Sequence, residues 1–402
     1  MASRRHTRSG WSGSGPGDRG ACPATGVAST LITVPADQRI AAIETAELVT
    51  RYPRTIGRNA RLGSHGSGPT APAVVVRTAD GASGWGVVGR GSLDEVAALV
   101  GAEVGTVFDP SIGVIDPRAS ALDFALHDLA AKDAGVPAYE LLGGRGETAV
   151  PCYSGAIYFD DLDPDDAPRG VRAVLANCAS DREAGYRAFK LKIGRGHRWM
   201  DAEAGFARDV EVTHAVREAY PDARILVDAN NGFSPHETVR YLRAVADCEL
   251  YWLEEPFHED AMSLRVVHDF LRESGSSTLI ADGEFEPDEA QVLELAQAGL
   301  IDVLLMDVVS FGLTDWRRVM PAVRESGADA SPHAWGLPIK TYYAAQMAAG
   351  LGSVRTVEGV PGVTDGVDAS GYDLLDGVLS VPDAPGFGLE LTAPTRPLQP
   401  TR

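Results

Sequence analysis

Charged side chains follow several short apolar runs in the second half of this sequence, where they could carry out chemistry together. Lys190 and Lys192 lie two residues apart on a predicted strand, so both side chains point to the same side of it. Lysines are rarely buried without a function. Two lysines side by side near a cation have their charged forms disfavoured, and one of them can then act as a base near neutral pH. The alternative is a pair of solvated lysines at the edge of a sheet.

Three carboxylates follow the next three predicted strands in turn. Asp228, Glu254 and Glu284 each stand at or just beyond the end of one strand. Three acids around one cavity repel one another unless a cation lies between them, and oxygen ligands without Cys or His favour Mg²⁺ over Zn²⁺. Any one of these acids could be a solvated loop residue, and Asp228 with Asn230 is also typical of an ordinary turn. Asp282 offers a second carboxylate at the third position.

A candidate acid–base pair lies on the strands that come next. Asp307 ends the sixth predicted strand and His333 ends the seventh. An acid on one strand can accept a hydrogen bond from an imidazole on the next, which fixes the tautomer of the histidine and raises its pKa. A lone histidine is more often structural, but this one lies one strand from an acid. Glu358 ends the last strand and is a candidate hydrogen-bonding acid for a substrate oxygen.

These side chains need a fold that brings successive strand ends together. From about residue 151 the sequence alternates between strands and crossover-length helices, which predicts a parallel barrel with its chemistry at the carboxyl ends of the strands. A doubly wound sheet alternates in the same way, but no glycine-rich phosphate loop follows any strand. The predicted strands are Cys152–Tyr158, Ala188–Ile193, Ile225–Asp228, Tyr251–Glu254, Thr278–Ala281, Val303–Asp307, Ala328–Pro332 and Val354–Glu358. The predicted helices include Asp201–Ala219, Glu237–Ala246 (preceded by Ser234 as N-cap and Pro235), Ser263–Ser274, Glu286–Ala298 and Lys340–Ala349.

The residues before the barrel, 37–150, are predicted to form an α+β domain. A hairpin turn at Asp80-Gly81 joins two of its three strands. The glycine-rich and arginine-rich stretch Tyr52–Thr70 is a candidate active-site lid, and the alternative is a merely flexible connection. The predicted strands are Ile40–Val49, Ala73–Thr78 and Gly84–Val88, and the predicted helices are Leu93–Val100, Ala119–Ala134 and Pro137–Leu142.

The composition narrows the class of protein. The chain has 402 residues, of which 44% are hydrophobic, so a large core and more than one compact unit are expected. The formal net charge of −20 argues against non-specific binding to nucleic acid or to an anionic membrane. No run approaches the length of a transmembrane helix, and no apolar segment follows Arg4 and Arg5 as a secretory signal would require. Four scattered cysteines favour a reducing, cytoplasmic location, and residues 1–36 are predicted to be a disordered leader.

Taken in order, these motifs resemble those of the enolase superfamily, and within it the acid-sugar dehydratases and racemases similar to mandelate racemase and muconate lactonizing enzyme. The resemblance runs from about Ile40 to Leu391. Many members continue the motif Gly84-Trp-Gly86 with Glu, whereas this sequence has Val87, so lid contacts are not carried over. The motifs that carry the resemblance are Lys-Leu-Lys (190–192), Val-Asp-Ala-Asn (227–230), Trp-Leu-Glu-Glu-Pro (252–256), Asp-Gly-Glu (282–284), Asp307 with His333, Glu358, and the tail Val381–Glu390.

The resemblance implies a fold and a division of the chain. The fold would be a modified TIM barrel, (β/α)7β, with an N-terminal α+β capping domain that the C-terminal tail completes. The capping domain would occupy residues 37–150, the barrel 151–375 and the returning segment 376–402, after the leader at 1–36. A symmetric homo-oligomer is expected from analogy with the family alone.

The resemblance also implies a role for each site residue. Asp228, Glu254 and Glu284 would bind Mg²⁺, with Glu284 preferred over Asp282 because this subgroup uses the acid in Gly-Glu. Lys192 would remove the proton alpha to a carboxylate of a small-molecule substrate. Two further roles complete the set, namely stabilisation of the enediolate oxygens by Lys190 and opposite-face acid–base catalysis by His333, oriented by Asp307.

The predicted function is therefore Mg²⁺-dependent dehydration of a sugar acid, an aldonate or an aldarate, to a 2-keto-3-deoxy acid. A racemase or epimerase, or a lactone cycloisomerase, could use the same side chains. A catalytically silent barrel that acts as a binding protein is a remote alternative. The lysine pair, the three acids and the His–Asp pair argue against it.

Overall fold

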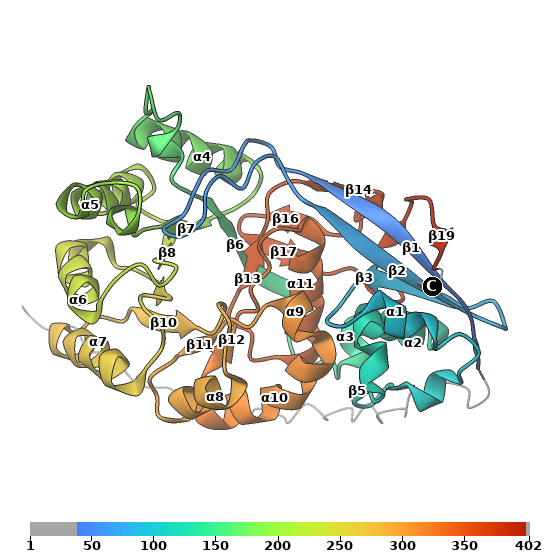
Figure 1. The fold of residues 1–402 in the computed structure, drawn as a ribbon. Coiled ribbons are helices and arrows are strands. Elements are labelled where there is room, and N and C mark those ends of the chain that lie inside the picture. Colours follow the sequence, from blue (N-terminus) through green and yellow to red (C-terminus); the bar gives the residue numbers. More distant parts are fainter. Residues whose placement is uncertain (1–37, 399–402) are drawn as a thin grey trace, which may run out of the picture. The chain divides into compact units, whose positions relative to one another are not determined.

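Eight parallel strands form a closed barrel in the computed structural model, which describes residues 38–398 (Figure 1). Neighbouring strands follow chain order from the first to the seventh, and the eighth pairs with the first. Pairing of Ala330 with Val354 joins the seventh strand to the eighth segment and closes the sheet. The strands are β6 (Ala149–Ile157), β7 (Ala188–Lys192), β8 (Arg224–Asp228), β9 (Trp252–Glu254), β10 (Leu279–Asp282), β11 (Val303–Leu304), β12 (Asp329–Ala330) and β13 (Val357–Gly359).

A helix follows each of the first seven barrel strands, so the architecture is (β/α)7β, as predicted. The helices are α4 (Val171–Glu183), α5 (Ala202–Ala219), α6 (Pro235–Ala244), α7 (Ala261–Ser274), α8 (Glu289–Gln297), α10 (Leu313–Ser326) and α11 (Pro338–Leu351). Shorter helices lie in the connections, namely η3 (Asp160–Leu162), η4 (Arg195–His197), η5 (Ala246–Cys248) and α9 (Val308–Phe311). Helices α4 and α10 add to the five helical stretches named from the sequence. None of the helices within residues 38–398 combines the length and the apolar character that crossing a membrane demands.

The alternation of side chains along the strands separates two hydrophobic layers. Along each strand, every second residue packs inside the barrel, and the residues between them pack under the surrounding helices. On β8, for example, Leu226 lies in the interior cluster while Ile225 and Val227 belong to the outer core. Because the side-chain period is two, Asp228 points the same way as Leu226, and Glu254 the same way as Trp252. The interior cluster consists of Tyr153, Leu226, Trp252, Ala281, Val303 and Leu305.

The capping part is an antiparallel sheet packed against helices. Strands β1 (Ile40–Arg51), β2 (Thr70–Thr78) and β3 (Ser83–Val87) form its centre, and the turn between β2 and β3 contains Gly81 with a positive φ of 95°. That conformation favours glycine, which confirms the predicted hairpin. The remaining elements are α1 (Leu93–Ala97), η1 (Val104–Thr106), β4 (Phe108–Asp109), β5 (Gly113–Val114), η2 (Pro117–Leu122), α2 (Asp123–Asp133) and α3 (Ala138–Leu141).

The C-terminal part of the chain contributes to both sheets. Strands β14 (Val363–Asp365) and β19 (Arg396–Pro397) pair with β1 of the capping sheet. Between them, β16 (Asp373–Leu375) and β17 (Val378–Ser380) extend the barrel sheet beside β6, and β15 (Val367–Asp368) pairs with β18 (Glu390–Leu391). The chain therefore reaches the capping sheet before residue 376 and returns to it afterwards. The division at residues 37–150, 151–375 and 376–402 stays a prediction, and the predicted leader lies outside the described residues.

Helix α6, which follows the strand that ends in Asp228, begins with a complete capping box. The Ser234 side chain accepts a hydrogen bond from the Glu237 backbone N–H, and the Glu237 carboxylate accepts one from the Ser234 backbone N–H. Pro235 occupies the first helical position, as predicted.

Replacing Ser234 with alanine is expected to lower the free energy of unfolding by about 0.5–2 kcal/mol, because the Glu237 N–H loses its hydrogen-bond partner and the Glu237 carboxylate loses the Ser234 hydroxyl group. Chemical denaturation of the Ser234→Ala variant measures this change. Ser277→Ala, at an exposed position outside any helix, is the matched control and is expected to change stability by less than about 0.5 kcal/mol. Equal stability of the two variants would contradict the capping role.

Candidate active site

The strand register places a lysine and two acids in one row at the carboxyl end of the barrel. Lys192 on β7 pairs with Asp228 on β8, and Asp228 pairs with Glu254 on β9. All three side chains are buried, with relative exposures of 3%, 0% and 1%. The row continues the inward-facing positions of the barrel interior, so the strand pattern itself directs these polar groups into one cavity.

Both lysines contact carboxylates in this cavity, which confirms the predicted convergence of their side chains. Lys190 Nζ lies 2.6 Å from Glu254 Oε1 and 2.9 Å from Glu358 Oε1. Lys192 Nζ contacts Asp228 Oδ2. Burial lowers the pKa of Lys190, but Glu254 and Glu358 outweigh burial and the pKa is raised well above its ordinary value. Burial and Lys190 lower the pKa of Lys192, and Asp228 reverses this to a raised value.

These directions arise from the protein side chains alone, whereas the expected loss of positive charge was for two lysines beside a bound cation. Two adjacent ammonium groups disfavour each other, but each of them also touches a carboxylate at hydrogen-bond distance. An opposite charge at that range in a buried site outweighs a like charge farther away.

Three acids of the cavity form a group that could hold a cation. One carboxylate oxygen from each of Asp228, Glu254 and Glu284 lies within 4.8 Å of the others. Burial and the charges of Asp228 and Glu284 raise the pKa of Glu254 well above its ordinary value in spite of Lys190. Glu284 Oε2 is buried and has no hydrogen-bond partner among the described residues. An all-oxygen donor set of mutually repelling carboxylates fits a hard divalent cation.

The geometry also distinguishes the two acids at the end of β10, Asp282 in the last position of the strand and Glu284 two residues later. Glu284 belongs to the group of three, whereas Asp282 does not. Asp282 Oδ1 accepts a hydrogen bond of 2.8 Å from the Gly283 N–H, and burial raises the pKa of this carboxyl group well above its ordinary value. The chain thus brings Glu284, rather than Asp282, together with Asp228 and Glu254.

The predicted His–Asp pair is present on the opposite side of the cavity. His333 Nδ1 lies 2.9 Å from Asp307 Oδ2, and His333 Nε2 lies 3.1 Å from Glu284 Oε1. Strand β11 ends at Leu304, earlier than predicted, because Asp307 instead caps the short helix α9. A single parallel bridge between Asp307 and His333 continues the ladder beyond the strand ends. With Nδ1 bound to the carboxylate, Nε2 is the nitrogen that faces the acids and lysines.

Glu358 on β13 lies deeper in the cavity, between Lys190 and the turn that follows His333. Its Oε2 atom accepts a hydrogen bond of 2.8 Å from the Ala334 N–H. Burial raises the pKa of Glu358, but Lys190 and His333 outweigh burial and lower it to about 2, so the group is charged at neutral pH. Its predicted contact with a substrate oxygen stays a prediction.

The predicted lid, residues 52–70, is pinned to the carboxyl ends of the barrel strands. Ile56 and Gly66 pair across the loop and give it a narrow hairpin form. The Arg61 guanidinium donates a hydrogen bond of 2.8 Å from Nε to the carbonyl oxygen of Asn230. Asn230, whose role the sequence left open, donates from Nδ2 to Asp228 Oδ2 at 3.3 Å. It therefore links the lid to one of the three acids.

Aromatic rings line the cavity between the lid and the lysines. Tyr158 lies below Lys192, whose Nζ is 5.1 Å from the ring centroid. The Trp335 ring packs 4.9 Å from Tyr158 and 5.5 Å from Tyr52, and the His65 ring meets Tyr158 at 4.7 Å. Burial, together with Lys192, lowers the pKa of His65 to about 4, so this imidazole is neutral at physiological pH. Trp335 thus faces the cavity.

The structure places Arg195 and His197 differently, although the sequence did not reveal the direction of either side chain. Arg195 is fully buried and bridges Asp161 and Asp209 at 2.7 Å each, so its guanidinium is already satisfied within the fold. His197 is exposed.

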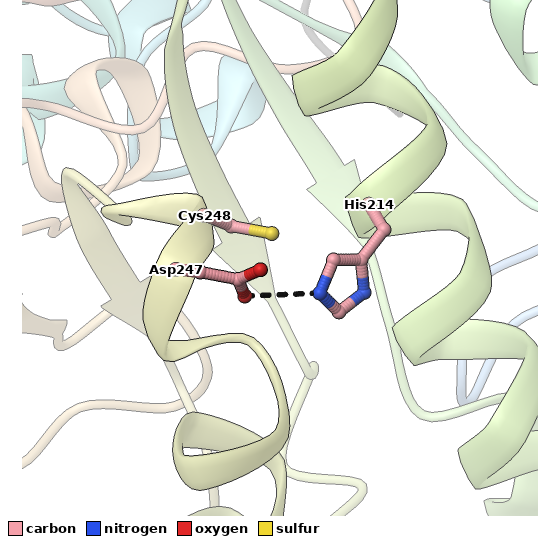
Figure 2. A group of neighbouring side chains, drawn as sticks. All are labelled: His214, Asp247 and Cys248. Atoms are coloured by element: carbon pink, nitrogen blue, oxygen red, sulfur yellow. Dashed lines mark hydrogen bonds and ion pairs between the residues drawn. The ribbon is translucent and has the colours of Figure 1, made fainter.

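A second group of metal-binding residue types lies outside the barrel, between α5 and η5, and comprises His214, Asp247 and Cys248 (Figure 2). His214 Nε2 lies 3.0 Å from Asp247 Oδ1, and the His214 side chain is half-buried while that of Asp247 is largely exposed. Burial and Asp247 raise the pKa of the Cys248 thiol to about 11, which disfavours the thiolate that a metal requires. Of the two groups, the three acids in the barrel are therefore the candidate metal centre.

Sequence reasoning missed one charged side chain next to the site. Lys340, in the first turn of α11, contacts Asp307 Oδ2 and donates a hydrogen bond of 3.0 Å to the carbonyl oxygen of Trp335. In the sequence, the only unusual property of Lys340 is its place at the start of a predicted helix, where cations are disfavoured.

Comparison with known proteins identifies the family. A sequence model of the family described as Enolase C-terminal domain-like matches residues 173–395. The crystal structure of a galacturonate dehydratase from a Geobacillus species, complexed with D-galacturonate and 5-keto-4-deoxy-D-galacturonate, is similar with a TM-score of 0.82 and 31% identity, covering 89% of this chain and 95% of that chain. A mandelate racemase/muconate lactonizing protein from Geobacillus, complexed with magnesium and tartrate, gives a TM-score of 0.83 at 31% identity over 89% and 94% of the two chains.

A curated relative adds a second activity to the comparison. The 3,6-anhydro-alpha-L-galactonate cycloisomerase of Streptomyces coelicolor is 31% identical over 285 residues, which are 68% of this chain and 69% of that protein. The family match spans more than half of the chain, and the similar galacturonate dehydratase structure covers 89% of it. The chain belongs to the enolase superfamily, among the enzymes of the mandelate racemase and muconate lactonizing type.

Proposed function

We propose that this protein is a Mg²⁺-dependent acid-sugar dehydratase that removes the proton alpha to a carboxylate. The observation that carries the proposal is one cavity with two buried lysines on one side, a His–Asp pair on the other, and three acids between them. The galacturonate dehydratase among the similar structures supports dehydration of an acid sugar.

Asp228, Glu254 and Glu284 are the residues that would hold Mg²⁺, and the magnesium-bound neighbour supports this choice of ion. When bound there, Mg²⁺ supplies positive charge beside the substrate carboxylate and so favours the enediolate that forms when the alpha proton leaves. Trp252 supports the site from below, because its indole N–H donates a hydrogen bond of 3.1 Å to Glu254 Oε2 and fixes the orientation of that carboxylate.

The lysines provide the base and a fixed positive charge. In its neutral form, Lys192 Nζ accepts the alpha proton, and the electron pair of the broken C–H bond moves into the carboxylate. Lys190, buried between Glu254 and Glu358, keeps its charge and stabilises the oxygen on which negative charge develops. Both lysines are buried, and the rings of Tyr153 and Tyr158 lie against Lys190 and Lys192.

The His–Asp pair acts on the opposite side of the substrate. His333 donates a proton from Nε2 to the hydroxyl group beta to the carboxylate, the C–O bond breaks, and water leaves. The electron pair of the enediolate forms the new C=C bond, and the resulting enol becomes a 2-keto-3-deoxy acid. Asp307 holds Nδ1 at 2.9 Å, which keeps the donating nitrogen directed into the cavity.

A cycloisomerase is the second candidate, because the relative from Streptomyces coelicolor is a cycloisomerase of an anhydro-sugar acid. In that reaction the electron pair expels a ring oxygen rather than a free hydroxyl group, and the same base and acid suffice. An epimerase would use His333 to return a proton to the opposite face. A homo-oligomeric state and a cytoplasmic location stay predictions from the sequence.

The test is incubation of the purified protein with a library of aldonates, aldarates, uronates and anhydro-sugar acids in the presence of Mg²⁺. A dehydratase is expected to release a keto acid, which semicarbazide detects, and the His333→Asn variant is expected to lose at least about 100-fold in kcat. Ring opening without release of water would identify a cycloisomerase, and inverted substrate without keto acid an epimerase. No turnover of any acid by a folded, Mg²⁺-saturated protein would refute the proposal.

A further inference from the structure

Lys340 occupies a position that local helix preferences disfavour. It is the third residue of α11 (Pro338–Leu351), where the helix dipole presents its positive end and cations are destabilised. Its side chain is almost buried, with a relative exposure of 9%, so water does little to solvate the ammonium group. Positions at which a chain departs from local preferences are commonly functional, and the reason must lie in the partners of the residue.

Its partners are the acid of the His–Asp pair and the turn behind the histidine. Lys340 Nζ contacts Asp307 Oδ2, the same oxygen that lies 2.9 Å from His333 Nδ1. It also donates a hydrogen bond of 3.0 Å to the carbonyl oxygen of Trp335. The other carboxylate oxygen, Oδ1, accepts hydrogen bonds from the backbone N–H groups of Val309 and Ser310 at 3.0 and 2.8 Å.

The start of α9 thus holds Oδ1, and Lys340 holds Oδ2, the oxygen that faces the imidazole. A cavity of about 380 Å³ lies against this group, lined in part by Glu284, Asp307, His333 and Lys340. Without the ammonium group of Lys340, Oδ2 of Asp307 has room to rotate into this cavity and accept a hydrogen bond from water. Burial raises the pKa of Asp307, but Lys340 and His333 bring it well below its ordinary value, so this carboxyl group is ionised at neutral pH.

The same lysine connects the His–Asp pair to the lid. The turn at Trp335, which Lys340 contacts, is also bound by the lid. The Tyr52 hydroxyl group donates a hydrogen bond of 2.8 Å to the Gly336 carbonyl oxygen. The Trp335 indole N–H in addition donates to His65 Nδ1 at 3.5 Å. Lid residues and acid–base residues thus share one turn, which Lys340 ties to Asp307.

We propose that Lys340 is a positioning residue that holds Asp307, and through it His333, in the orientation needed for the acid step. This inference rests on the proposed function, in which His333 protonates the leaving hydroxyl group. Lys340 reaches the substrate only through Asp307 and His333. Its loss is therefore expected to slow the step that needs His333 and to spare the removal of the alpha proton by Lys192.

The test is the Lys340→Met variant, assayed for dehydration and for exchange of the substrate alpha proton in D₂O. We expect kcat for dehydration to fall about 10–100-fold, as for other residues that orient a working histidine, with KM changed less than about twofold. Exchange by Lys192 is expected to continue at the wild-type rate. Lys340→Arg, which keeps a cation within reach of Asp307, is expected to recover most of the lost kcat.

The matched control is Lys132→Met, which removes a similar Lys–Asp pair, Lys132 with Asp128 at 2.6 Å, in the capping part. This control is expected to leave kcat unchanged. A rise in KM with unchanged kcat for Lys340→Met would overturn the proposal in favour of direct substrate binding. Equal loss of dehydration and exchange would also overturn it, since the whole site would then be disturbed.

A readout without substrate separates this inference from the proposed function. The imidazole Nδ1–H proton of His333, identified in ¹⁵N-histidine spectra by its loss in His333→Asn, is expected to give a downfield, hydrogen-bonded signal. The signal should disappear in Lys340→Met and persist in Lys132→Met. If no acid sugar is turned over, the proposed function fails while this signal still decides whether Lys340 positions the pair. An unchanged signal in Lys340→Met would refute the positioning role.

Discussion

Replacing Lys192 with methionine is expected to reduce kcat by about 10²–10⁴-fold, the usual contribution of a positioned general base. Methionine preserves the length of the buried side chain and removes only the group that accepts the alpha proton. Lys192 is the β7 member of the row formed by β7, β8 and β9, with its Nζ against Asp228 and 5.1 Å from the centroid of the Tyr158 ring. Among the described lysines only Lys190 also reaches these acids, and its pKa, raised well above the ordinary value by Glu254 and Glu358, makes it a poor substitute base.

Lys192→Arg is the informative companion to this variant. Arginine restores a positive charge beside Asp228, but its guanidinium does not deprotonate in proteins and cannot serve as a base. If Lys192 acts as the base, both variants are inactive in dehydration and in exchange of the alpha proton. Substantial activity of Lys192→Arg would show that charge alone is needed, and wild-type exchange in Lys192→Met would exclude Lys192 as the base.

Replacing Glu254 with glutamine is expected to weaken Mg²⁺ binding by at least about tenfold. Loss of a residue that merely orients a ligand commonly costs 10–100-fold in metal affinity, and loss of a charged ligand should cost no less. The reason is electrostatic, because the like charges of Asp228, Glu254 and Glu284 favour a cation between them. Isothermal titration with MgCl₂ measures the change, and the Mg²⁺-dependent rise in Tm gives a second value.

The Asp282→Asn variant is the matched control for this experiment. Asp282 lies two residues from Glu284 and is buried, but its carboxylate is not among the three that converge. We expect a change in Mg²⁺ affinity of less than about threefold for Asp282→Asn and a change similar to that of Glu254→Gln for Glu284→Gln. The opposite order for these two neighbours would move the third ligand from Glu284 to Asp282.

Much of the site could be predicted because local sequence determines which side of a strand each residue occupies. Lys190 and Lys192 share one side by the period of two, and Asp228 and Glu254 follow interior residues by the same rule. The start of α6 could be predicted for a similar reason, because it depends on neighbouring residues only. Ser234 supplies the capping hydrogen bond, and Pro235 supplies the fixed backbone angle.

The C-terminal part of the chain was predicted less well for a physical reason. Strands β14 and β17 are short and partly exposed, so neither shows a clear pattern of alternation in the sequence. Their partners, β1 and β6, lie far away along the chain. Such pairings depend on which sheet edges the rest of the fold leaves open, and no short window of sequence contains that information.

The sequence by itself determined the residue types at the strand ends, the alternation that predicts a barrel and the set of side chains that meet in it. The tertiary structure decided which atoms touch. It brought Glu284 rather than Asp282 to the other acids, paired each lysine with a carboxylate so that its pKa is raised, and placed Lys340 on Asp307. The period of a strand is a property of the local backbone, whereas distances and charges within a cavity arise only when the barrel closes and burial strengthens each electrostatic contact.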